Sequence, residues 1–432
     1  MRLFKKSKKK VCVVGLDGVP HSLLEKFISN GTMPVMANLS AQGHLHKMKV
    51  TLPEISSVSW TSFMTGSGPG THGIFGFIDI KPGTMEMKFP SFKDVKIQTF
   101  WDRLGKKDKK CIIINQPSTY PARPITGGIL ISGFVAIELS KSVFPARHIG
   151  DLKRMNYELD IETHRARKDS DYLIRSLGTS LEGRRKALEL FWDKEDWDYF
   201  QLVVTGTDRL QHYLWNAIED ENHQYHGAVI NYYKRVDSLI GEIVEKFEKK
   251  TGKAGGELFL LSDHGFTKIK KEFNLNTWLE KEGYLSFADG SKPDLNNLSG
   301  KAFALDPGRI YFNRKGRFPN GTVDPEDFPS LTKEISEKLL SIECNGDKVV
   351  KEVLQCRDIY DGPETPFGPD LNVLTNYGYD VKGALGKSDI LMETDLQGMH
   401  TWDDAFFWAK DKISDDVNIT QLASLIEDVL SD

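Results

Sequence analysis

The chain has 432 residues, of which 39% are hydrophobic and 27% are charged, and its net charge is −4. This composition is that of a soluble globular protein, and the length suits a large α/β domain with insertions, or two domains. The small negative charge gives no reason to expect nucleic acid as a partner.

The first ten residues, MRLFKKSKKK, form a basic stretch before a short apolar run, VCVVGL. That run is too short for a signal-peptide core or a membrane span, so we expect no transmembrane segment. Residues 1–10 are predicted to be a solvated basic tail, with weak attraction to an anionic membrane surface as the alternative.

The four cysteines show no CxxC spacing, and two of them lie in apolar runs that are typical of buried strands. Buried free thiols are typical of a reducing compartment, so we expect a cytoplasmic protein. The residues are Cys12, Cys111, Cys344 and Cys356.

Residues 11–16 form a continuous apolar run with β-branched side chains, which predicts a strand buried on both faces of a parallel sheet. The same reasoning applied along the chain predicts a mainly parallel sheet with alternating helices. The further predicted strands are 110–115, 128–132, 198–204, 257–262 and 309–312, and the predicted helices are 22–30, 33–41, 95–104, 180–194, 221–249 and 331–342.

The predicted fold class is therefore α/β, an α/β/α sandwich around a mainly parallel central sheet. Residues 267–390 are richer in Gly, Pro and Asn than the rest, and we expect an inserted subdomain there that flanks the site. The catalytic core would then comprise residues 11–266 and 391–432.

Residues 51–77 combine a cluster of serine and threonine hydroxyls with a glycine-rich bend. Such a stretch can present a side-chain oxygen to a ligand, although most Ser/Thr and Gly clusters are only loops. It lacks the GxxxxGK[ST] pattern, so a phosphate-binding P-loop is not supported. We expect His72 in this bend to be a packing residue.

Three predicted strands run into an acidic residue, namely Asp17, Asp208 and Asp263. In open α/β sheets the ligand crevice lies outside the carboxyl ends of the strands, so these side chains should share one crevice. Carboxylates that are gathered so closely repel each other unless a cation neutralises them.

Histidines accompany these carboxylates. His212 stands four residues after Asp208, on the same face of a helical turn, and His264 directly follows Asp263. His400 lies in the late segment GMHTWDD. Three Asp and three His favour Zn²⁺ or another first-row divalent ion over Ca²⁺ or Mg²⁺, and six ligands are too many for one tetrahedral ion but suit two.

Five separated segments give the chain a marked resemblance to a known family. They are VVGLDG (13–18), the segment from Ser56 through WTSFMTG to PGTHGIFGF (56–77), TDRLQH (207–212), LSDHGF (261–266) and GMH (398–400). In this order they resemble the alkaline phosphatase superfamily, in its type I phosphodiesterase/nucleotide pyrophosphatase branch. The resemblance spans residues 11–409.

The resemblance implies a two-metal site with a hydroxyl nucleophile. One ion would be held by Asp17, Asp263, His264 and the nucleophile oxygen, and the other by Asp208, His212 and His400. The nucleophile would be the residue four positions before Trp60, which is Ser56. Ser57 is the alternative, because the family usually has a proline where this chain has Val58.

One departure from the family concerns phosphate binding. The nucleotide pyrophosphatases carry an Asn shortly after their HGI motif that helps to bind the phosphate oxygens, and Gly76 and Phe77 stand in that region here. The oxyanion contact must then come from elsewhere, with the backbone near Ser57, Asn115 or Arg209 as candidates. Candidates for substrate specificity in the insertion are Arg309, Tyr311 and Arg317, for which a structural role is as plausible.

The predicted function is metal-dependent hydrolysis of a small-molecule phosphate ester, a phosphodiester or pyrophosphate, through a phosphoseryl intermediate. Two divalent ions are expected, Zn²⁺ first and Mn²⁺ second. A phosphomonoesterase, a phosphonate hydrolase and a phosphotransferase of the same superfamily are the alternatives, as is a non-catalytic binding module on this fold. A sulfatase is disfavoured because the chain has no CxPxR motif. The sequence leaves the oligomeric state open.

Overall fold

The computed structural model describes residues 9–252, 255–288 and 292–431. All but the last two residues of the predicted basic tail therefore lie outside the described residues. Within the described ranges, no helix combines the length and the apolar composition that crossing a bilayer requires.

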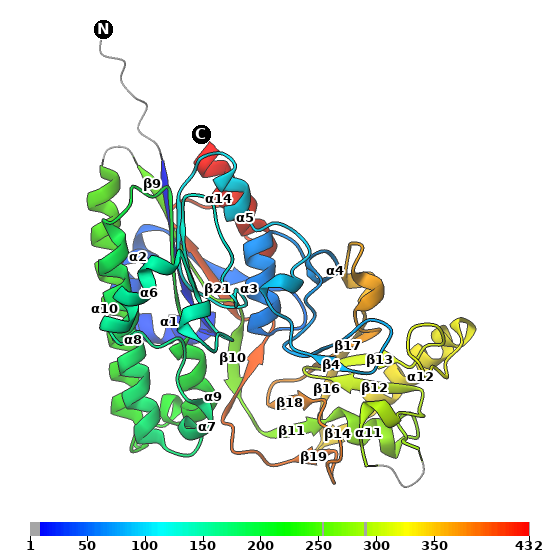
Figure 1. Cartoon of the computed structure of the whole chain (residues 1–432). Helices are drawn as coiled ribbons and strands as arrows, with labels where there is room; N and C mark the ends of the chain where they lie inside the picture. Colours follow the sequence, from blue (N-terminus) through cyan, green and yellow to red (C-terminus); the bar gives the residue numbers. More distant parts are fainter. Residues whose placement is uncertain (1–8, 253–254, 289–291, 432) are drawn as a thin grey trace.

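The larger lobe is built on an eight-stranded sheet whose centre is parallel (Figure 1). β1 pairs in parallel with β8 and β9, and β5 pairs in parallel with β8 and β6, whereas β7, β21 and β2 add antiparallel edges. The strands in spatial order are β2 (His44–Met48), β21 (Ala405–Ala409), β9 (Gly256–Leu261), β1 (Lys10–Leu16), β8 (Tyr199–Val204), β5 (Cys111–Gln116), β6 (Ile129–Ser132) and β7 (Val143–Phe144).

Alternate side chains of β1 enter two different hydrophobic cores, one on each face of the sheet. Cys12 and Val14 pack into the core under one helical layer, and Val11 and Val13 pack into the core under the other. The first layer contains α1 (His21–Ser29), α2 (Pro34–Gln42), α8 (Ser170–Trp192), α9 (Gly206–Glu219) and α10 (His226–Thr251), and the second contains α3 (Ser56–Thr65), α5 (Phe100–Gly105) and α14 (Leu422–Ser431) (Figure 1). The predicted α/β/α sandwich is confirmed.

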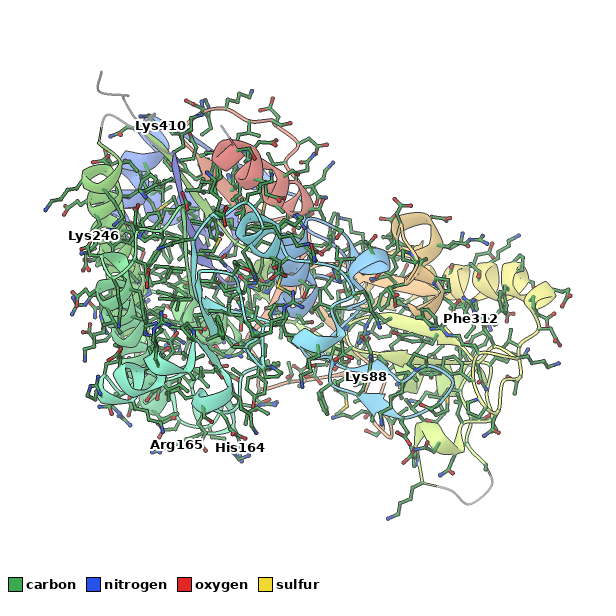
Figure 2. The ribbon with its side chains drawn as sticks, turned by 45° about the horizontal axis from the view of Figure 1, so that its top comes forward. Lys88, His164, Arg165, Lys246, Phe312 and Lys410 are labelled. Carbon is green, nitrogen blue, oxygen red and sulfur yellow. The ribbon has the colours of Figure 1, made fainter. Side chains whose placement is uncertain are left out.

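A smaller lobe has its own hydrophobic core, a four-stranded sheet and a three-stranded sheet. Figure 2 shows Phe312 and Lys88 in this lobe, far from Lys246 on α10. Its elements are β11 (Lys271–Asn274), α11 (Leu275–Lys281), β12 (Ala302–Leu305), β13 (Arg309–Phe312), α12 (Phe328–Ser341), β16 (Val350–Gln355), β17 (Leu371–Thr375), β18 (Tyr379–Lys382) and β19 (Leu391–Met392).

The hairpin of β3 (Asp79–Ile80) and β4 (Met87–Lys88) also joins the smaller lobe, because Met85 in its turn is buried in that core. The hydrophobic core of the smaller lobe therefore draws on residues well before position 267. The division into an insertion at 267–390 and a core on both sides stays a prediction.

The predicted helix at 95–104 is wrong over its first half. Residues 92–94 form a single 3-10 turn, and α5 begins only at Phe100. A capping box sets this start, since the Thr99 side chain accepts from the Asp102 amide and the Asp102 side chain accepts from the Thr99 amide. Val95 is an apolar residue of the loop before α5 that is buried without being helical, so its spacing from the apolar residues of α5 resembled that of a helix.

Four strands that matter for the site were not predicted. β2 and β21 extend the sheet, and a separate antiparallel ribbon joins β10 (Gly265–Lys268) to β20 (Gly398–Thr401). In this ribbon His400 lies opposite Phe266, and so close to His264. The ribbon is what carries the late histidine to the carboxyl ends of the central strands.

Candidate active site

The three aspartates meet at the carboxyl edge of the parallel strands, as predicted. Asp17 directly follows β1, Asp263 lies two residues after β9, and Asp208 lies in the first turn of α9 after β8. All three side chains are buried. The chain thus places three carboxyl groups in one low-dielectric crevice, as the topology rule requires.

Ser56 is the first residue of α3, and it is buried against the same crevice. Its Oγ lies 3.2 Å from Asp17 Oδ1 and 3.1 Å from His264 Nε2. One helical turn later, Trp60 donates its indole N–H to Asp17 Oδ2 at 3.0 Å. Helix α3 therefore both presents the hydroxyl and fixes the carboxylate beside it.

Asp17, Asp263 and His264 form one potential ligand group. Each offers one ligand atom, and these atoms lie within 4.8 Å of one another. His264 Nε2 is 3.3 Å from Asp263 Oδ2 and 3.7 Å from Asp17 Oδ1. The backbone N–H of Gly18 donates to Asp263 Oδ1 at 3.0 Å, which leaves Oδ2 without a hydrogen-bond partner among the described residues.

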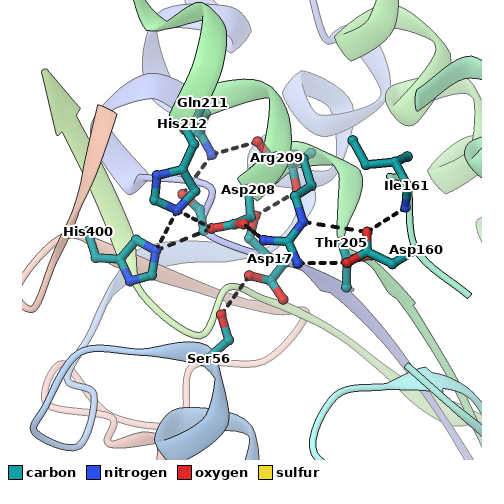
Figure 3. A network of polar contacts seen from close by, with 12 residues as sticks. Asp17, Ser56, Asp160, Ile161, Thr205, Asp208, Arg209, Gln211, His212 and His400 are labelled. Atoms are coloured by element: carbon teal, nitrogen blue, oxygen red, sulfur yellow. Dashed lines mark hydrogen bonds and ion pairs between the residues drawn. The ribbon is translucent and has the colours of Figure 1, made fainter. Parts of the chain in front are cut away.

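Asp208, His212 and His400 form the second group (Figure 3). Asp208 Oδ2 lies 3.4 Å from His212 Nε2 and 3.3 Å from His400 Nε2, and the two imidazole nitrogens are 3.1 Å apart. His264 stacks on His400 with ring centroids 3.7 Å apart, and the trio Asp208, His264 and His400 also lies within 4.8 Å. The two groups are therefore adjacent, with His264 between them.

All three histidines turn Nε2 toward the crevice and Nδ1 toward a backbone carbonyl. Their Nδ1 atoms lie 3.1 Å, 2.9 Å and 2.9 Å from the backbone carbonyl oxygens of Gly265, Gly398 and Glu54, for His264, His212 and His400 respectively. A carbonyl can only accept, so Nδ1 carries the hydrogen and the Nε2 lone pair faces the carboxylates. Metal-binding histidines typically make this hydrogen bond, in which the ring nitrogen that is not a ligand donates to a backbone carbonyl.

Burial and mutual repulsion set the charge of the first group. Burial, followed by the charges of Asp263 and Asp208, raises the pKa of Asp17 well above its usual value. The pKa of Asp263 is raised to about 8, mainly by burial. Burial also lowers the pKa of His264, so this ring stays neutral and supplies no compensating charge. A bound cation would remove the repulsion between the two carboxylates.

Arg209 makes the second group different. Burial alone would raise the pKa of Asp208, but the neighbouring His212, followed by His400 and Arg209, holds it well below its usual value. Arg209 Nη1 donates to Asp208 Oδ1 at 2.9 Å, and its Nη2 donates to Asp160 Oδ2 at 2.7 Å (Figure 3). Asp160 lies in an irregular segment, and no sequence pattern marks it.

Two candidates for phosphate binding occupy different surroundings. Asn115 Nδ2 donates to the carbonyl of Val203 at 2.8 Å, which ties β5 to β8. Ser57 lies in the first turn of α3, where amide groups have no intrahelical acceptor, and its Oγ is buried with no partner among the described residues. The start of α3 is therefore the better placed of these two for an anionic oxygen.

The remaining singled-out residues have structural contacts. His72 is fully buried, its Nε2 is 3.0 Å from Ser62 Oγ, and its Nδ1 accepts from the Ile74 amide. It is not among the ligand groups. The three insertion candidates are also engaged elsewhere: Arg309 donates to Asp79 and Ile78, Tyr311 stacks on Phe303, and Arg317 donates to the carbonyls of Phe367 and Gly368.

The sequence model for type I phosphodiesterase/nucleotide pyrophosphatase matches residues 11–403, which is most of the chain. The chain belongs to this family. A search among curated proteins gives no significant match.

Solved structures with the same fold are distant in sequence. Phosphonoacetate hydrolase from Sinorhizobium meliloti, in complex with phosphonoacetate, is 14% identical with a TM-score of 0.65, over 98% of this chain and 96% of that one. Murine ectonucleotide pyrophosphatase/phosphodiesterase 5, an inactive form in complex with AMP, is 13% identical with a TM-score of 0.57, over 98% and 95%. The alkaline phosphatase PafA is 14% identical with a TM-score of 0.60, over 98% and 96%.

Family membership and the alkaline phosphatase-like fold identify a metal-dependent phosphoric ester hydrolase. The residues of the crevice suit this chemistry, because carboxylate oxygens and imidazole nitrogens are ligands for divalent first-row ions. Asp208 Oδ2 and Asp263 Oδ2 are buried acceptors without a hydrogen-bond donor among the described residues, as expected of atoms that face a cation.

Proposed function

We propose that the protein hydrolyses a small-molecule phosphodiester or pyrophosphate with Ser56 as nucleophile and two divalent metal ions. Asp17, Asp263, His264 and Ser56 would hold one ion, and Asp208, His212 and His400 would hold the other. The supporting observation is the common orientation of the three histidines, each with Nδ1–H toward a backbone carbonyl and Nε2 toward the buried carboxylates.

Bound divalent ions supply positive charge that lowers the pKa of a hydroxyl and neutralises the phosphoryl oxygens. The chain supplies the positioning. Ser56 Oγ directs its hydrogen toward Asp17 Oδ1, so a lone pair is free for phosphorus. Attack forms the Ser56 Oγ–phosphorus bond, releases the hydroxyl proton to solvent and breaks the bond to the leaving oxygen, which takes a proton from solvent. This intermediate still carries the substituent of phosphorus that was not displaced. Water then cleaves its Ser56 Oγ–phosphorus bond, which restores the hydroxyl and releases a phosphate monoester.

Removal of the Ser56 oxygen tests this proposal most simply. Ser56→Ala is expected to lower kcat by roughly 10³-fold or more, because a nucleophile acts as a unit with its activating groups. Metal content, measured by elemental analysis, should stay near two ions per chain. Ser57→Ala is the matched control, and a larger loss with Ser57→Ala than with Ser56→Ala would assign the nucleophile to Ser57.

A phosphonate hydrolase is the second candidate. The structure of phosphonoacetate hydrolase in complex with phosphonoacetate resembles the whole chain, although at 14% identity this likeness concerns the fold. The same metal ligands and hydroxyl suit three other reactions: cleavage of a carbon–phosphorus bond, hydrolysis of a phosphomonoester and transfer of a phosphoryl group. A panel of one diester, one monoester and phosphonoacetate, assayed with added Zn²⁺ or Mn²⁺, separates these activities.

We further propose Zn²⁺ as the resident metal, with Mn²⁺ as the alternative, and a cytoplasmic location. Three histidine ligands favour Zn²⁺. The four cysteines form no disulfide, which suits a reducing compartment. Elemental analysis of protein purified without added metal, and fractionation of cells, are the corresponding tests.

A further inference from the structure

An apolar cavity of about 470 Å³ opens beside the start of α3. Its walls include Phe77, Tyr120, Phe134 and Val135, and Ser57 and Thr61 lie on its α3 side. None of the described residues that line it carries a charge. Its volume is within the range of cavities that enclose a small organic molecule.

The cavity begins one residue from the proposed nucleophile. Ser57, which lines it, follows Ser56 in the chain, and Thr61 Oγ1 donates to the Ser57 carbonyl at 2.6 Å. Ser118, also in the wall, donates to the same carbonyl at 3.4 Å. A group attached to a phosphorus atom at Ser56 therefore has this cavity within reach.

Phe77 connects the cavity with the ligand histidines. It also lines a second cavity of about 230 Å³, which reaches His212 and His400 and contains polar groups such as Lys382. The Phe77 ring meets the Phe134 ring edge to face at 5.2 Å, and Phe134 lies under the Arg209 guanidinium at 4.1 Å. The apolar and polar cavities thus lie on two sides of one aromatic wall beside the site.

The mouth of the apolar cavity carries exposed hydrophobic side chains. Phe89 is 77% exposed and Ile137 is 81% exposed, although both are large and apolar. Burial in the fold does not account for them, and exposed apolar groups around a cavity are typical of a ligand-binding surface.

We propose that this cavity binds an uncharged, apolar organic group of the substrate, so that the enzyme prefers phosphate esters of apolar alcohols over nucleotides and carboxylated phosphonates. This inference rests on the proposed function of the adjacent site. A charged group would lose its hydration in this cavity without gaining a partner, whereas each methylene group gains from leaving water. The apolar group is an alkyl chain or an aryl ring, since both have the required chemistry.

Equilibrium binding to the metal-loaded Ser56→Ala protein tests the inference without turnover. Titration calorimetry would compare methyl phosphate with hexyl phosphate, phenyl phosphate and thymidine 5′-phosphate. Hexyl or phenyl phosphate should bind at least about tenfold more tightly than methyl phosphate, given a gain of about fourfold per buried methylene group. The better of these two ligands distinguishes an alkyl chain from an aryl ring.

Substitutions at the mouth locate the effect. Added to Ser56→Ala, the pair Phe89→Ser and Ile137→Ser should reduce the preference for hexyl over methyl phosphate by about fivefold or more. The matched control is Ile413→Ser, at an exposed apolar residue outside this cavity, which should leave the preference unchanged. Both positions in the pair are exposed, so the variant should fold.

Two results would overturn the inference: equal binding of methyl and hexyl phosphate with no gain for phenyl phosphate, or tighter binding of thymidine 5′-phosphate than of hexyl and phenyl phosphate. Its failure is distinguishable from failure of the proposed function. Wild-type protein that cleaves esters but shows no apolar preference contradicts the inference alone. Wild-type protein that cleaves no ester in the panel contradicts the proposed function, whatever the binding preference.

Discussion

The two lobes contain buried charges in contrasting surroundings. In the smaller lobe, Arg309 is fully buried, and it donates to Asp79 at 2.7 Å and to the Ile78 carbonyl at 2.7 Å. In the larger lobe, Asp17 and Asp263 are equally buried, but their neighbour His264 has a lowered pKa and stays neutral. The protein itself neutralises the first charge and leaves the second pair in need of a cation.

This contrast distinguishes a structural charge from a functional one. The ion pair between Arg309 and Asp79 joins the 79–88 hairpin to β13. The Arg309 guanidinium also packs against Gly76 and leaves no room there for a Cβ atom. Burying a carboxylate without such a partner reduces the stability of the fold, and such groups are typical of functional sites. Substitutions in the two lobes should therefore separate activity from stability.

The largest expected effect concerns Asp263. Asp263→Asn should lower kcat/KM by roughly 10³-fold, because it removes one ligand and one charge from the first metal group. The metal-free variant should nevertheless melt at the same or a higher temperature than metal-free wild type near neutral pH, since burial already raises the pKa of this carboxyl to about 8. Steady-state kinetics and calorimetry measure the two quantities. A metal-free variant that is less stable than metal-free wild type would show that the Asp263 carboxylate stabilises the fold without a cation.

Arg309→Met should have the opposite profile. Removing one partner of a buried pair leaves Asp79 uncompensated, at a cost of about 3–5 kcal/mol in the free energy of unfolding. Denaturant unfolding measures this loss. Arg357→Met, at an exposed arginine of the same lobe, is the matched control and should change stability little. Unchanged stability of Arg309→Met would show that the buried pair is not structural.

Arg209→Gln tests the intermediate case, a charge that supports a ligand. Its guanidinium holds Asp208 through Nη1, so its loss should reduce activity by about 10–100-fold, as for other residues that position metal ligands. The apparent affinity for the metal, measured by competition with a chelator, should fall with it. Activity loss without any change in metal affinity would instead indicate a direct contact of Arg209 with the phosphate.

The smallest effect concerns the pH dependence of stability at His72. Burial lowers its pKa to about 3, so below its usual value near 6.5 the unfolded chain binds a proton that the folded chain does not. Its contribution to stability is therefore complete above about pH 6.5 and falls by about 2 kcal/mol towards about pH 5. His72→Gln should flatten the stability profile in this range, whereas His44→Gln, at an exposed position, should not.

Much of the site could be predicted because it follows from strand ends. The apolar runs before Asp17, Asp208 and Asp263 are central parallel strands, and parallel topology alone brings the carboxyl ends together. The i, i+4 spacing of Asp208 and His212 likewise survives on α9. These are local rules, and the structure follows them.

Contacts between distant segments could not be predicted in the same way. His400 reaches the crevice through the antiparallel pairing of β20 with β10, and nothing in its short segment specifies that partner. Asp160 contacts Arg209 from a segment without regular structure. Arg309 pairs with Asp79, which lies 230 residues earlier in the chain. The Thr99/Asp102 capping box, by contrast, was visible in the sequence and would have corrected the start of α5.

The central claim is that Ser56 attacks phosphorus in a site whose buried carboxylates are neutralised by metal ions. Rapid acid quenching during turnover of a diester, followed by peptide mass spectrometry, measures it most directly. The account predicts one phosphoryl group on Ser56 that keeps the undisplaced ester group of the diester in the wild-type protein, and none in Ser56→Ala or in protein freed of metal. A phosphoryl group on another residue, or steady turnover by Ser56→Ala at the wild-type rate, would contradict it.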